Sequence, residues 1–276
     1  MLIVLFALLL CWKISNVQSA PVETEVDFSS DRILDLSYTY DKNTVYWPHG
    51  KGYDTFNLTM IAYNEADPDK IFYRAGYYST GEHGGTHIDT PAHLLRNGTD
   101  AENLEIQQLI GPAVVISIAE HIQAGHLDYA LSPSDVSQWE SQHGRIPDGA
   151  FVFLFADWGQ RWPDRQRVFN VDDLSDYSHM RFPGFHPDAI QWLITQRDIR
   201  GVASDGPSVE SSVDIASERM GTHILLAKHN RIGVENVANL HKVPATGATV
   251  ILMPMKISNA TGAPLRLFAV LPEQKE

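Results

Sequence analysis

The segment from His83 to His93 places three histidines and one aspartate within eleven residues, and two adjacent glycines follow His83. Glycine loses more backbone freedom in a helix than other residues do, so a continuous helix through this segment is disfavoured. We expect an extended path instead, in which side chains alternate and His87 and Asp89 therefore point the same way. The segment predicts a strand end that aims two polar side chains at one point.

A helix start is expected directly after this strand. Thr90 is a favourable N-cap, and Pro91 is a favourable first helical residue because the first turn leaves its amide groups unpaired in any case. Gly98 is a typical stop, so the helix should run to about Asn97. His93 then lies in the first turn, close to the end of the strand.

The residue types in this cluster are those of a metal site. Neutral imidazole and carboxylate bind zinc and similar divalent ions, and His83 can reach the point shared by His87 and Asp89 across the glycine bend. A lone histidine is more often a solvated or hydrogen-bonded group. Three histidines and an aspartate at one strand-to-helix junction favour a metal site, although their spacing fixes neither the ion nor the number of ions.

The pattern His83-x-Gly-Thr-His87-x-Asp89-x-Pro91-x-His93 resembles the signature of the metal-dependent cyclase-like hydrolases. That family includes the bacterial-type kynurenine formamidases and the isatin hydrolases. The motif is long and much more specific than a pair of histidines. One departure is the leucine after the last histidine, where an aromatic residue is common in the family, and it bears on substrate shape.

The resemblance extends over about Leu34 to Leu271. Trp47, in Val-Tyr-Trp-Pro, is similar to an early substrate-side tryptophan of the family, whereas composition alone would place it in the core. The segment Gly201–Ser208 is similar to a strand and loop in the middle of the family domain. His223 and Glu235, twelve residues apart, resemble its C-terminal His…Glu pair.

The resemblance implies a first ion bound by His83, His87 and Asp89. In the formamidases Asp89 would bridge to a second ion, which His223 and Glu235 would hold. Members similar to the isatin hydrolases work with one manganese ion, so the site is expected to take one or two zinc ions, or manganese as the alternative.

The same resemblance gives His93 a role in proton transfer and Trp47 a role in substrate binding. A divalent ion lowers the pKa of water to about 7, which indicates metal-assisted amide hydrolysis. No G-x-S-x-G sequence occurs, so a serine hydrolase is disfavoured. The implied substrate is an aryl amide, N-formylkynurenine first, cleaved to formate and kynurenine. Isatin or another cyclic amide is the alternative, and a secreted binding protein of the same fold without activity is a third possibility.

Buried strands that alternate with amphipathic helices predict a single α/β domain over residues 28–276. The resemblance implies mixed sheets with a swivelling β/β/α-type core, in dimers or larger oligomers such as tetramers. Strands are expected at 34–47, 58–63, 71–78, 113–120, 151–156, 199–203, 248–257 and 265–271, and helices at 132–142, 186–196 and 218–229. A loop at 161–180 is expected over the mouth of the site, with a solvated surface loop as the alternative. Residues 157–159 are expected in a pocket wall.

The chain is acidic, with a net charge of −13 over 276 residues. Nucleic-acid binding requires a basic surface, so this charge argues against it. Residues 1–19 are predicted to be a signal peptide, because an apolar run from Leu2 to Trp12 precedes small residues at a possible cleavage site. The alternatives are a signal anchor or a buried strand. No later stretch is expected to span a membrane.

The only cysteine, Cys11, lies inside the predicted signal, so the mature chain should contain no disulfide and no cysteine nucleophile. Three sequons, at Asn57, Asn97 and Asn259, fit a secreted protein with N-glycans. The sequence therefore predicts an extracellular enzyme that acts on a small molecule.

Overall fold

The computed structural model describes residues 28–29, 32–48, 55–63, 66–217 and 219–273. The predicted signal peptide, residues 1–19, lies outside these ranges. Across the part of the chain that the structure describes, no helix has the length and apolar character needed to cross a membrane.

An eight-stranded sheet forms the centre of the molecule, in the order β1-β12-β11-β5-β7-β9-β10-β4. The last strand, β4, pairs with β10 on one edge and with β12 on the other, and this double pairing closes the sheet into a barrel. The strands are β1 Ile33–Asp35, β4 His87–Asp89, β5 Ile110–Ser117, β7 Phe151–Phe155, β9 Gly201–Ser204, β10 Ile232–Glu235, β11 Ala248–Pro254 and β12 Gly262–Val270.

The strands β5, β7, β9 and β10 run parallel and are covered on both faces, as parallel strands usually are. Alternate side chains of β7 enter two separate hydrophobic clusters. Val152 and Leu154 pack in the cluster between the sheet and the helices, whereas Phe151 and Phe153 pack inside the barrel. The continuous apolar run in the sequence therefore reflects burial on both faces, and the predicted mixed α/β, single-domain fold is confirmed.

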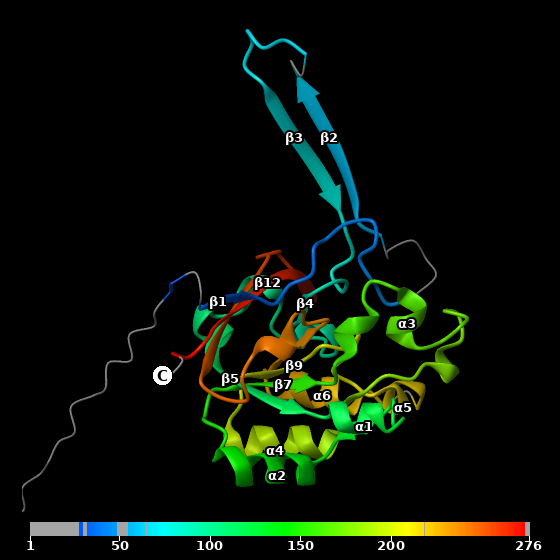
Figure 1. The fold of residues 1–276 in the computed structure, drawn as a ribbon, viewed down its shortest axis with the longest axis vertical. Coiled ribbons are helices and arrows are strands. Elements are labelled where there is room, and N and C mark those ends of the chain that lie inside the picture. Colours follow the sequence, from blue (N-terminus) through cyan, green and yellow to red (C-terminus); the bar gives the residue numbers. More distant parts are fainter. Residues whose placement is uncertain (1–27, 30–31, 49–54, 64–65, 218, 274–276) are drawn as a thin grey trace, which may run out of the picture.

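The helices lie on one side of the barrel, where α2 and α4 run side by side beneath the parallel strands (Figure 1). As predicted, Ser132 is the N-cap of α2 with Pro133 in its first turn, and Pro187 lies in the first turn of α4. The structure adds that His186 caps α4. The helices are α1 Ala119–Gln123, α2 Pro133–His143, α3 Arg165–Phe169, α4 Pro187–Arg197, α5 Ser212–Ala216 and α6 Gly221–Lys228. A small parallel sheet joins β6 Ala130–Leu131 to β8 Gly184–Phe185.

Two expectations were wrong in this part of the fold. The segment 34–47 is not one strand with a turn, because after β1 the chain makes only an isolated bridge between Tyr46 and Gly84. The Tyr40 hydroxyl donates instead to the carbonyls of Gly84 and Thr86, so this segment crosses the site and does not join the sheet. The segment 161–180 is not one irregular loop, because it contains α3 and short 3-10 turns.

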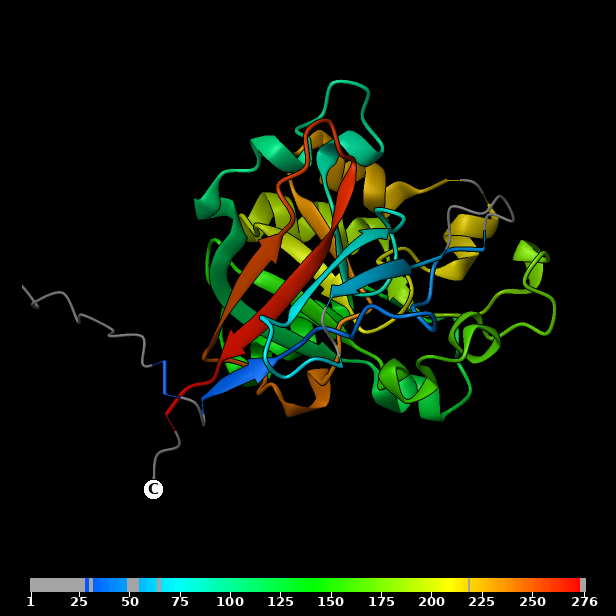
Figure 2. The same ribbon diagram turned by 90° about the horizontal axis from the view of Figure 1, so that it is seen from above.

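Strands β2 Asn57–Tyr63 and β3 Tyr73–Ser79 confirm the predicted pair at 58–63 and 71–78. They form a separate antiparallel sheet that projects from the barrel as a long hairpin (Figure 1). Seen from above, the hairpin rises on the side where β11, β12 and β1 lie next to one another (Figure 2).

A candidate metal centre at the closing strand of the barrel

Strand β4 delivers the central pair of the site. His87 and Asp89 are 2% and 5% exposed, and both side chains point into one cluster, as the expected alternation required. The antiparallel register places Glu235, the last residue of β10, directly opposite His87. The barrel closure therefore brings a carboxylate from a distant part of the sequence beside the motif.

His83 returns to the same cluster through the glycine bend. Gly85 has a φ of +59°, a left-handed conformation that glycine adopts without strain. His83 Nδ1 then lies 2.7 Å from Asp89 Oδ1. Gly262 provides the space for this ring, because a Cβ at that position would lie 2.5 Å from His83 Cε1.

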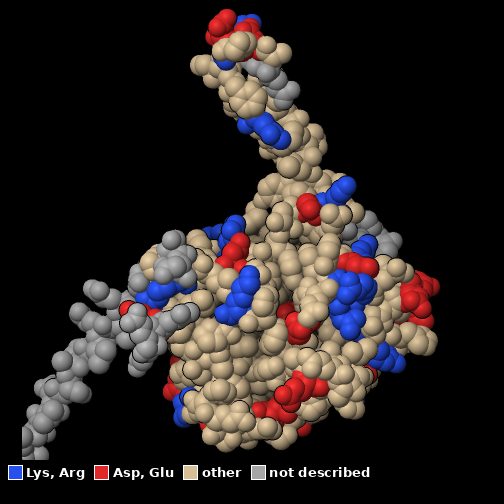
Figure 3. Space-filling model, in the orientation of Figure 1, with Lys and Arg blue, Asp and Glu red and all other residues tan. Residues whose placement is uncertain are grey.

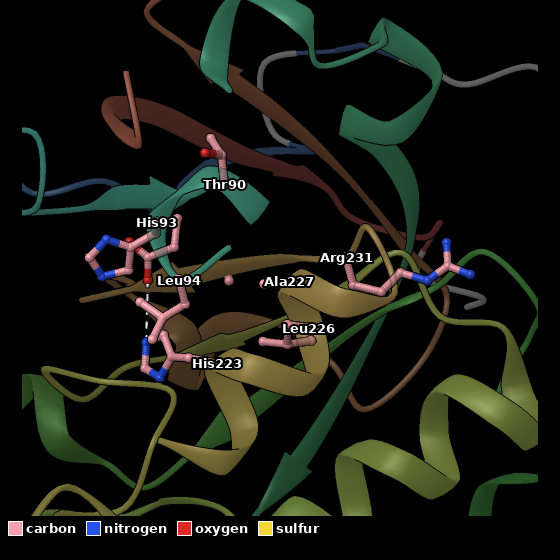
Figure 4. A pocket seen from close by; sticks show the side chains of 9 residues that line it. Thr90, His93, Leu94, His223, Leu226, Ala227 and Arg231 are labelled. Carbon is pink, nitrogen blue, oxygen red and sulfur yellow. Dashed lines mark ion pairs between the residues drawn. The ribbon is translucent and has the colours of Figure 1, made fainter. Parts of the chain in front are cut away.

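His223 enters from the first turn of α6 (Figure 4). Its Nε2 atom lies 3.3 Å from Glu235 Oε1 and 3.6 Å from Asp89 Oδ2. Behind the ring, Glu210 is fully buried and accepts hydrogen bonds from both the backbone N–H and the Nδ1 atom of His223, at 3.1 and 3.0 Å. This contact fixes Nε2 as the atom that faces the cluster.

The side chains form two overlapping triads, and within each triad the ligand-type atoms lie within 4.8 Å of one another. Asp89 belongs to both. The first triad is His83, His87 and Asp89, and the second is Asp89, His223 and Glu235. The structure thus brings together all five residues proposed as ligands, while their role in binding an ion stays a prediction.

The environment of His87 fits a divalent cation. Its Nδ1 lies 3.0 Å from the carbonyl of Gly85, to which it donates, so Nε2 is the nitrogen that faces the cluster. Nε2 is buried without a hydrogen-bond partner, and it lies 3.4 Å from both Asp89 Oδ1 and Glu235 Oε2. Two carboxylates beside this nitrogen favour positive charge there, supplied either by a proton on Nε2 or by a cation bound to it.

The ionisation of His87 leads to the same conclusion. Burial by itself lowers the pKa of this imidazole, but the carboxylates of Asp89 and Glu235 outweigh burial and raise the pKa to about 9. The cluster therefore holds positive charge strongly. Imidazole nitrogens with carboxylate oxygens suit zinc, manganese and related divalent ions, and this donor set does not choose between them.

His93 lies beside the triads and outside both of them. Its ring stacks on His83 with the centroids 4.0 Å apart, and it lies 6.1 Å from the ring of His223. Burial lowers the pKa of His93 to about 4, although Asp89 acts in the opposite direction, so the ring is neutral near pH 7. A neutral imidazole next to the ligands matches the predicted role in proton transfer.

The helix that carries His93 is shorter than expected. It is a 3-10 turn, Pro91–His93, and not a helix that runs to Asn97. Thr90 is its N-cap in backbone geometry, but the hydroxyl donates to the carbonyl of Thr261 and not to the turn. The side chain of Thr90 therefore ties the motif to the start of β12.

A cavity of about 320 Å³ opens onto the cluster. Trp47 lines it, as predicted, and packs edge-on against Phe169 with the ring centroids 5.2 Å apart. Apart from the ligands and His93, the described lining residues are Val45, Tyr46, Trp47, Leu94, Phe169, Pro207, Ser208, Ile215, Met220 and Asn236. None of these is lysine or arginine, so among the described lining residues the only ionisable acids and bases other than Tyr46 are the carboxylates and histidines of the cluster and His93.

The opposite side of the cluster is closed. A second cavity, between His93, His223 and the α6 residues Leu226 and Ala227, has a volume of only about 10 Å³ (Figure 4). That space holds about one water molecule. Of these two cavities beside the cluster, only the larger one beside Trp47 has room for an organic substrate.

The expectation of a pocket wall at 157–159 is wrong for its aromatic member. Trp158 is 1% exposed and its indole N–H donates to the carbonyl of Val168, so the ring belongs to the core. Asp205 accepts hydrogen bonds from the amides of Ala156 and Trp158. It joins the ends of β7 and β9 and does not touch the ligands, and burial raises its pKa to about 7.

Two functional positions had no signal in the sequence. Phe169 lies in the segment 161–180 that was expected to be an irregular loop, and only the helix α3 carries it to the cavity. Glu210 stands in a polar stretch after Val209 with no characteristic spacing to His223.

Replacing Glu210 with glutamine is expected to weaken metal binding about 10- to 100-fold, because an outer carboxylate orients and polarises the histidine that it contacts. Glutamine keeps the size of the side chain but loses one acceptor, and Glu210 accepts from Thr222 as well as twice from His223. Competition with a chromogenic chelator measures the affinity. An unchanged affinity together with a lower melting temperature would indicate a purely structural residue.

Comparison with known proteins agrees with this geometry. Residues 34–211 match the family described as "Putative cyclase". The isatin hydrolase of Roseibium aggregatum is 34% identical over 216 residues, which cover 76% of this chain and 80% of that protein. A kynurenine formamidase of Salinibacter ruber is 25% identical over 242 residues, which cover 85% of this chain and 95% of that protein.

Solved structures show the same relationship. Isatin hydrolase A from Labrenzia aggregata, bound to benzyl benzoate, has a TM-score of 0.76 at 31% identity over 88% of this chain and 94% of its own. An isatin hydrolase bound to the product analogue thioisatinate has a TM-score of 0.77 at 29% identity over 87% and 92% of the two chains. This chain therefore belongs to the cyclase family of metal-dependent hydrolases, which includes the isatin hydrolases and the kynurenine formamidases.

Proposed function

We propose that this chain hydrolyses the amide bond of a small, flat, uncharged aromatic amide, with cyclic amides of the isatin class ahead of N-formylkynurenine. The observation that carries this order is the cavity, in which aromatic walls adjoin the ligand cluster and no described lining residue is lysine or arginine. N-formylkynurenine has an amino-acid end whose carboxylate requires a cationic partner when it is desolvated. Isatin has no such group.

The residues of the chain divide the work of binding and catalysis. Trp47 and Phe169 present ring surfaces against which a flat substrate can pack. The two triads hold the ion, which when bound supplies Lewis acidity that activates water and polarises a carbonyl oxygen. The cavity between His93, His223 and α6 is too small for a substrate, so the substrate binds in the larger cavity beside Trp47.

His93 moves the proton. As a neutral imidazole it accepts a proton from the attacking water through one ring nitrogen and passes it to the aryl nitrogen as the C–N bond breaks. The acyl carbon then belongs to a carboxylic acid, which releases the second proton of the water to solvent and becomes a carboxylate, and the nitrogen leaves as a neutral aryl amine. Without this transfer the nitrogen would leave as a strongly basic anion.

The test compares two substrates in the full chain after removal of metal with a chelator and reconstitution with zinc or manganese. We expect turnover only after reconstitution, with a kcat/KM for isatin about tenfold or more above that for N-formylkynurenine. Activity that survives complete chelation would reject metal-dependent hydrolysis. A preference for N-formylkynurenine would reverse the order of substrates and leave the reaction class intact.

We also propose that the protein is secreted and glycosylated. The signal segment lies outside the described residues, and the support is that Asn57, Asn97 and Asn259 are all exposed. Expression in a eukaryotic secretory host should give a medium-borne protein whose mass falls on treatment with an N-glycosidase. Retention in the cells without a mass change would reject the proposal.

A further inference from the structure

Glu82 directly precedes the metal motif, and its half-buried carboxylate makes its contacts inside the fold. Figure 3 shows acidic side chains beside basic ones at several places on one face of the molecule, as in ordinary surface ion pairs. Glu82 differs, because among the described residues its only ion-pair partner is the ring of His83, whose Nε2 lies 3.8 Å from Glu82 Oε2. The carboxylate also accepts hydrogen bonds from the start of β12, which links the motif to a residue 179 positions later in the chain.

All of the hydrogen bonds from the start of β12 end on one oxygen of Glu82. Oε2 accepts from the Thr261 amide at 2.9 Å, from the Thr261 hydroxyl at 2.7 Å and from the Gly262 amide at 3.3 Å. A carboxylate has no proton to donate, so the hydroxyl proton of Thr261 lies between the two oxygens. The hydroxyl oxygen of Thr261 is then left as an acceptor for another group.

The ring of His83 is that group. Its Nε2 lies 2.9 Å from Thr261 Oγ1, and because the hydroxyl already donates to Glu82, Nε2 is the donor in this contact. In the neutral ring that binds a metal, the proton therefore sits on Nε2. Nδ1, which lies 2.7 Å from Asp89 Oδ1, is then the nitrogen that carries the lone pair for an ion.

The hydroxyl becomes a stronger acceptor through its bond to the carboxylate. His223 donates from its outer nitrogen directly to the buried carboxylate of Glu210. His83 donates to a hydroxyl instead, and a hydroxyl accepts more strongly when its own proton is bound to a carboxylate. The carboxylate of Glu82 therefore polarises His83 through the threonine, in the way that Glu210 polarises its own histidine directly.

Thr261 is held in place from both sides. Its carbonyl accepts from the amide of Thr90 at 3.0 Å and from the hydroxyl of Thr90 at 2.8 Å, and its amide donates to Glu82. These contacts of the Thr261 backbone are enough to anchor the start of β12. Anchoring does not explain a hydroxyl that also meets His83, so the side-chain contact points to a role in the metal site.

We propose that Glu82 is a positioning residue of the metal centre. It acts through the Thr261 hydroxyl to hold the proton of His83 on Nε2 and to present Nδ1 to the ion. Outer partners of this kind raise the basicity of a ligand and limit its rotation. The inference rests on the proposed metal-dependent function, but it concerns the binding of the ion and not the substrate.

Thr261 also completes the sequon that begins at Asn259, so a change of this residue can remove a glycan as well as the hydroxyl. Two control variants separate these effects. Asn259→Gly removes the sequon and keeps the hydroxyl, and glycine adopts the φ of +57° at this position without strain. Thr261→Ser keeps both the sequon and the hydroxyl.

Competition with a chromogenic chelator measures the zinc affinity of the full chain without any substrate. Thr261→Val keeps the shape of the side chain and loses the hydroxyl, and it is expected to weaken zinc binding about 10- to 100-fold. Thr261→Ser and Asn259→Gly are expected to bind zinc as the wild type does. Wild-type affinity in Thr261→Val, or an equal loss of affinity in Thr261→Ser, would overturn the proposal.

A double-mutant cycle tests whether Glu82 acts through the hydroxyl. Glu82→Gln alone is expected to weaken zinc binding about tenfold or more. The double variant Glu82→Gln/Thr261→Val is expected to bind zinc no more weakly than Thr261→Val alone, because the two changes break one chain of contacts. Losses of affinity that add, or a Glu82→Gln variant with a lower melting temperature and an unchanged zinc affinity, would overturn the proposal.

Proton–nitrogen NMR of the zinc-loaded chain with isotope-labelled histidine reads the ring of His83 directly. We expect a protonated Nε2 and a zinc-bound Nδ1, and zinc on Nε2 would overturn the proposal. A wild-type chain that gives this spectrum and these affinities but hydrolyses no amide would reject the proposed function and still support the inference. A wild-type chain that binds neither zinc nor manganese would overturn both.

Discussion

The Asp89→Asn variant is expected to lose metal binding and turnover together, because Asp89 is the residue that both triads share. Asparagine preserves the shape of the side chain and removes its charge. Breaking one partner of a buried ionic cluster costs about 3–5 kcal/mol. At 1.4 kcal/mol per factor of ten, that corresponds to about 10²- to 10⁴-fold in metal affinity. Elemental analysis after dialysis measures the metal, and circular dichroism checks the fold.

Asp205→Asn is the matched control for this experiment. The two aspartates are equally buried, at 5% exposed each. They differ in surroundings, since histidines around Asp89 hold its pKa well below the usual range against the effect of burial, whereas Asp205 accepts only from backbone amides. Asp205→Asn should change stability and keep the metal. Full metal occupancy in Asp89→Asn would refute the ligand assignment.

The His93→Ala variant is expected to retain its metal and lose about 10²- to 10⁴-fold in kcat, the usual contribution of a positioned acid or base. The ring lies outside both triads, so its removal leaves the proposed ligands in place. Its neutral state, caused mainly by burial, suits proton acceptance near pH 7. Steady-state kinetics with the metal-reconstituted protein separates kcat from KM.

His229→Ala serves as the control for the loss of a histidine. His229 is the exposed C-cap residue of α6, six positions after His223 and remote from the cavity lining. The His229→Ala variant should hydrolyse the substrate at the wild-type rate. An undiminished kcat in His93→Ala would show that His93 has no part in catalysis. Loss of the metal in His93→Ala would indicate that His93 is a ligand.

The local features of the site were predictable from the sequence because they depend on nearby residues. The glycine bend after His83 and the alternation of His87 and Asp89 follow from backbone preferences alone. The pairing of Glu235 with this motif depends on the closure of the barrel, which spacing cannot show. Glu235 was predicted as a ligand from the resemblance to a family. The register of β4 and β10 gives the structural reason why it lies beside the motif.

The errors have a common physical origin in tertiary contacts. The segment 34–47 has strand-like residues, but the hydroxyl of Tyr40 bonds to the carbonyls of Gly84 and Thr86 and holds the segment across the site. Trp158 was placed in a pocket wall on its aromatic character, yet its N–H finds a partner inside the core. In both cases a long-range hydrogen bond outweighed the local pattern.

Strand β4 is only three residues long, and it completes the barrel through its pairs with β10 and β12. Two of those three residues are His87 and Asp89. An ion held by these side chains would also hold the strand that closes the sheet, so metal binding and folding would be linked equilibria. An ion present at 100 times its dissociation constant would add about 2.7 kcal/mol to the free energy of unfolding. The concentration of available metal would then determine the stability of the folded protein as well as its activity.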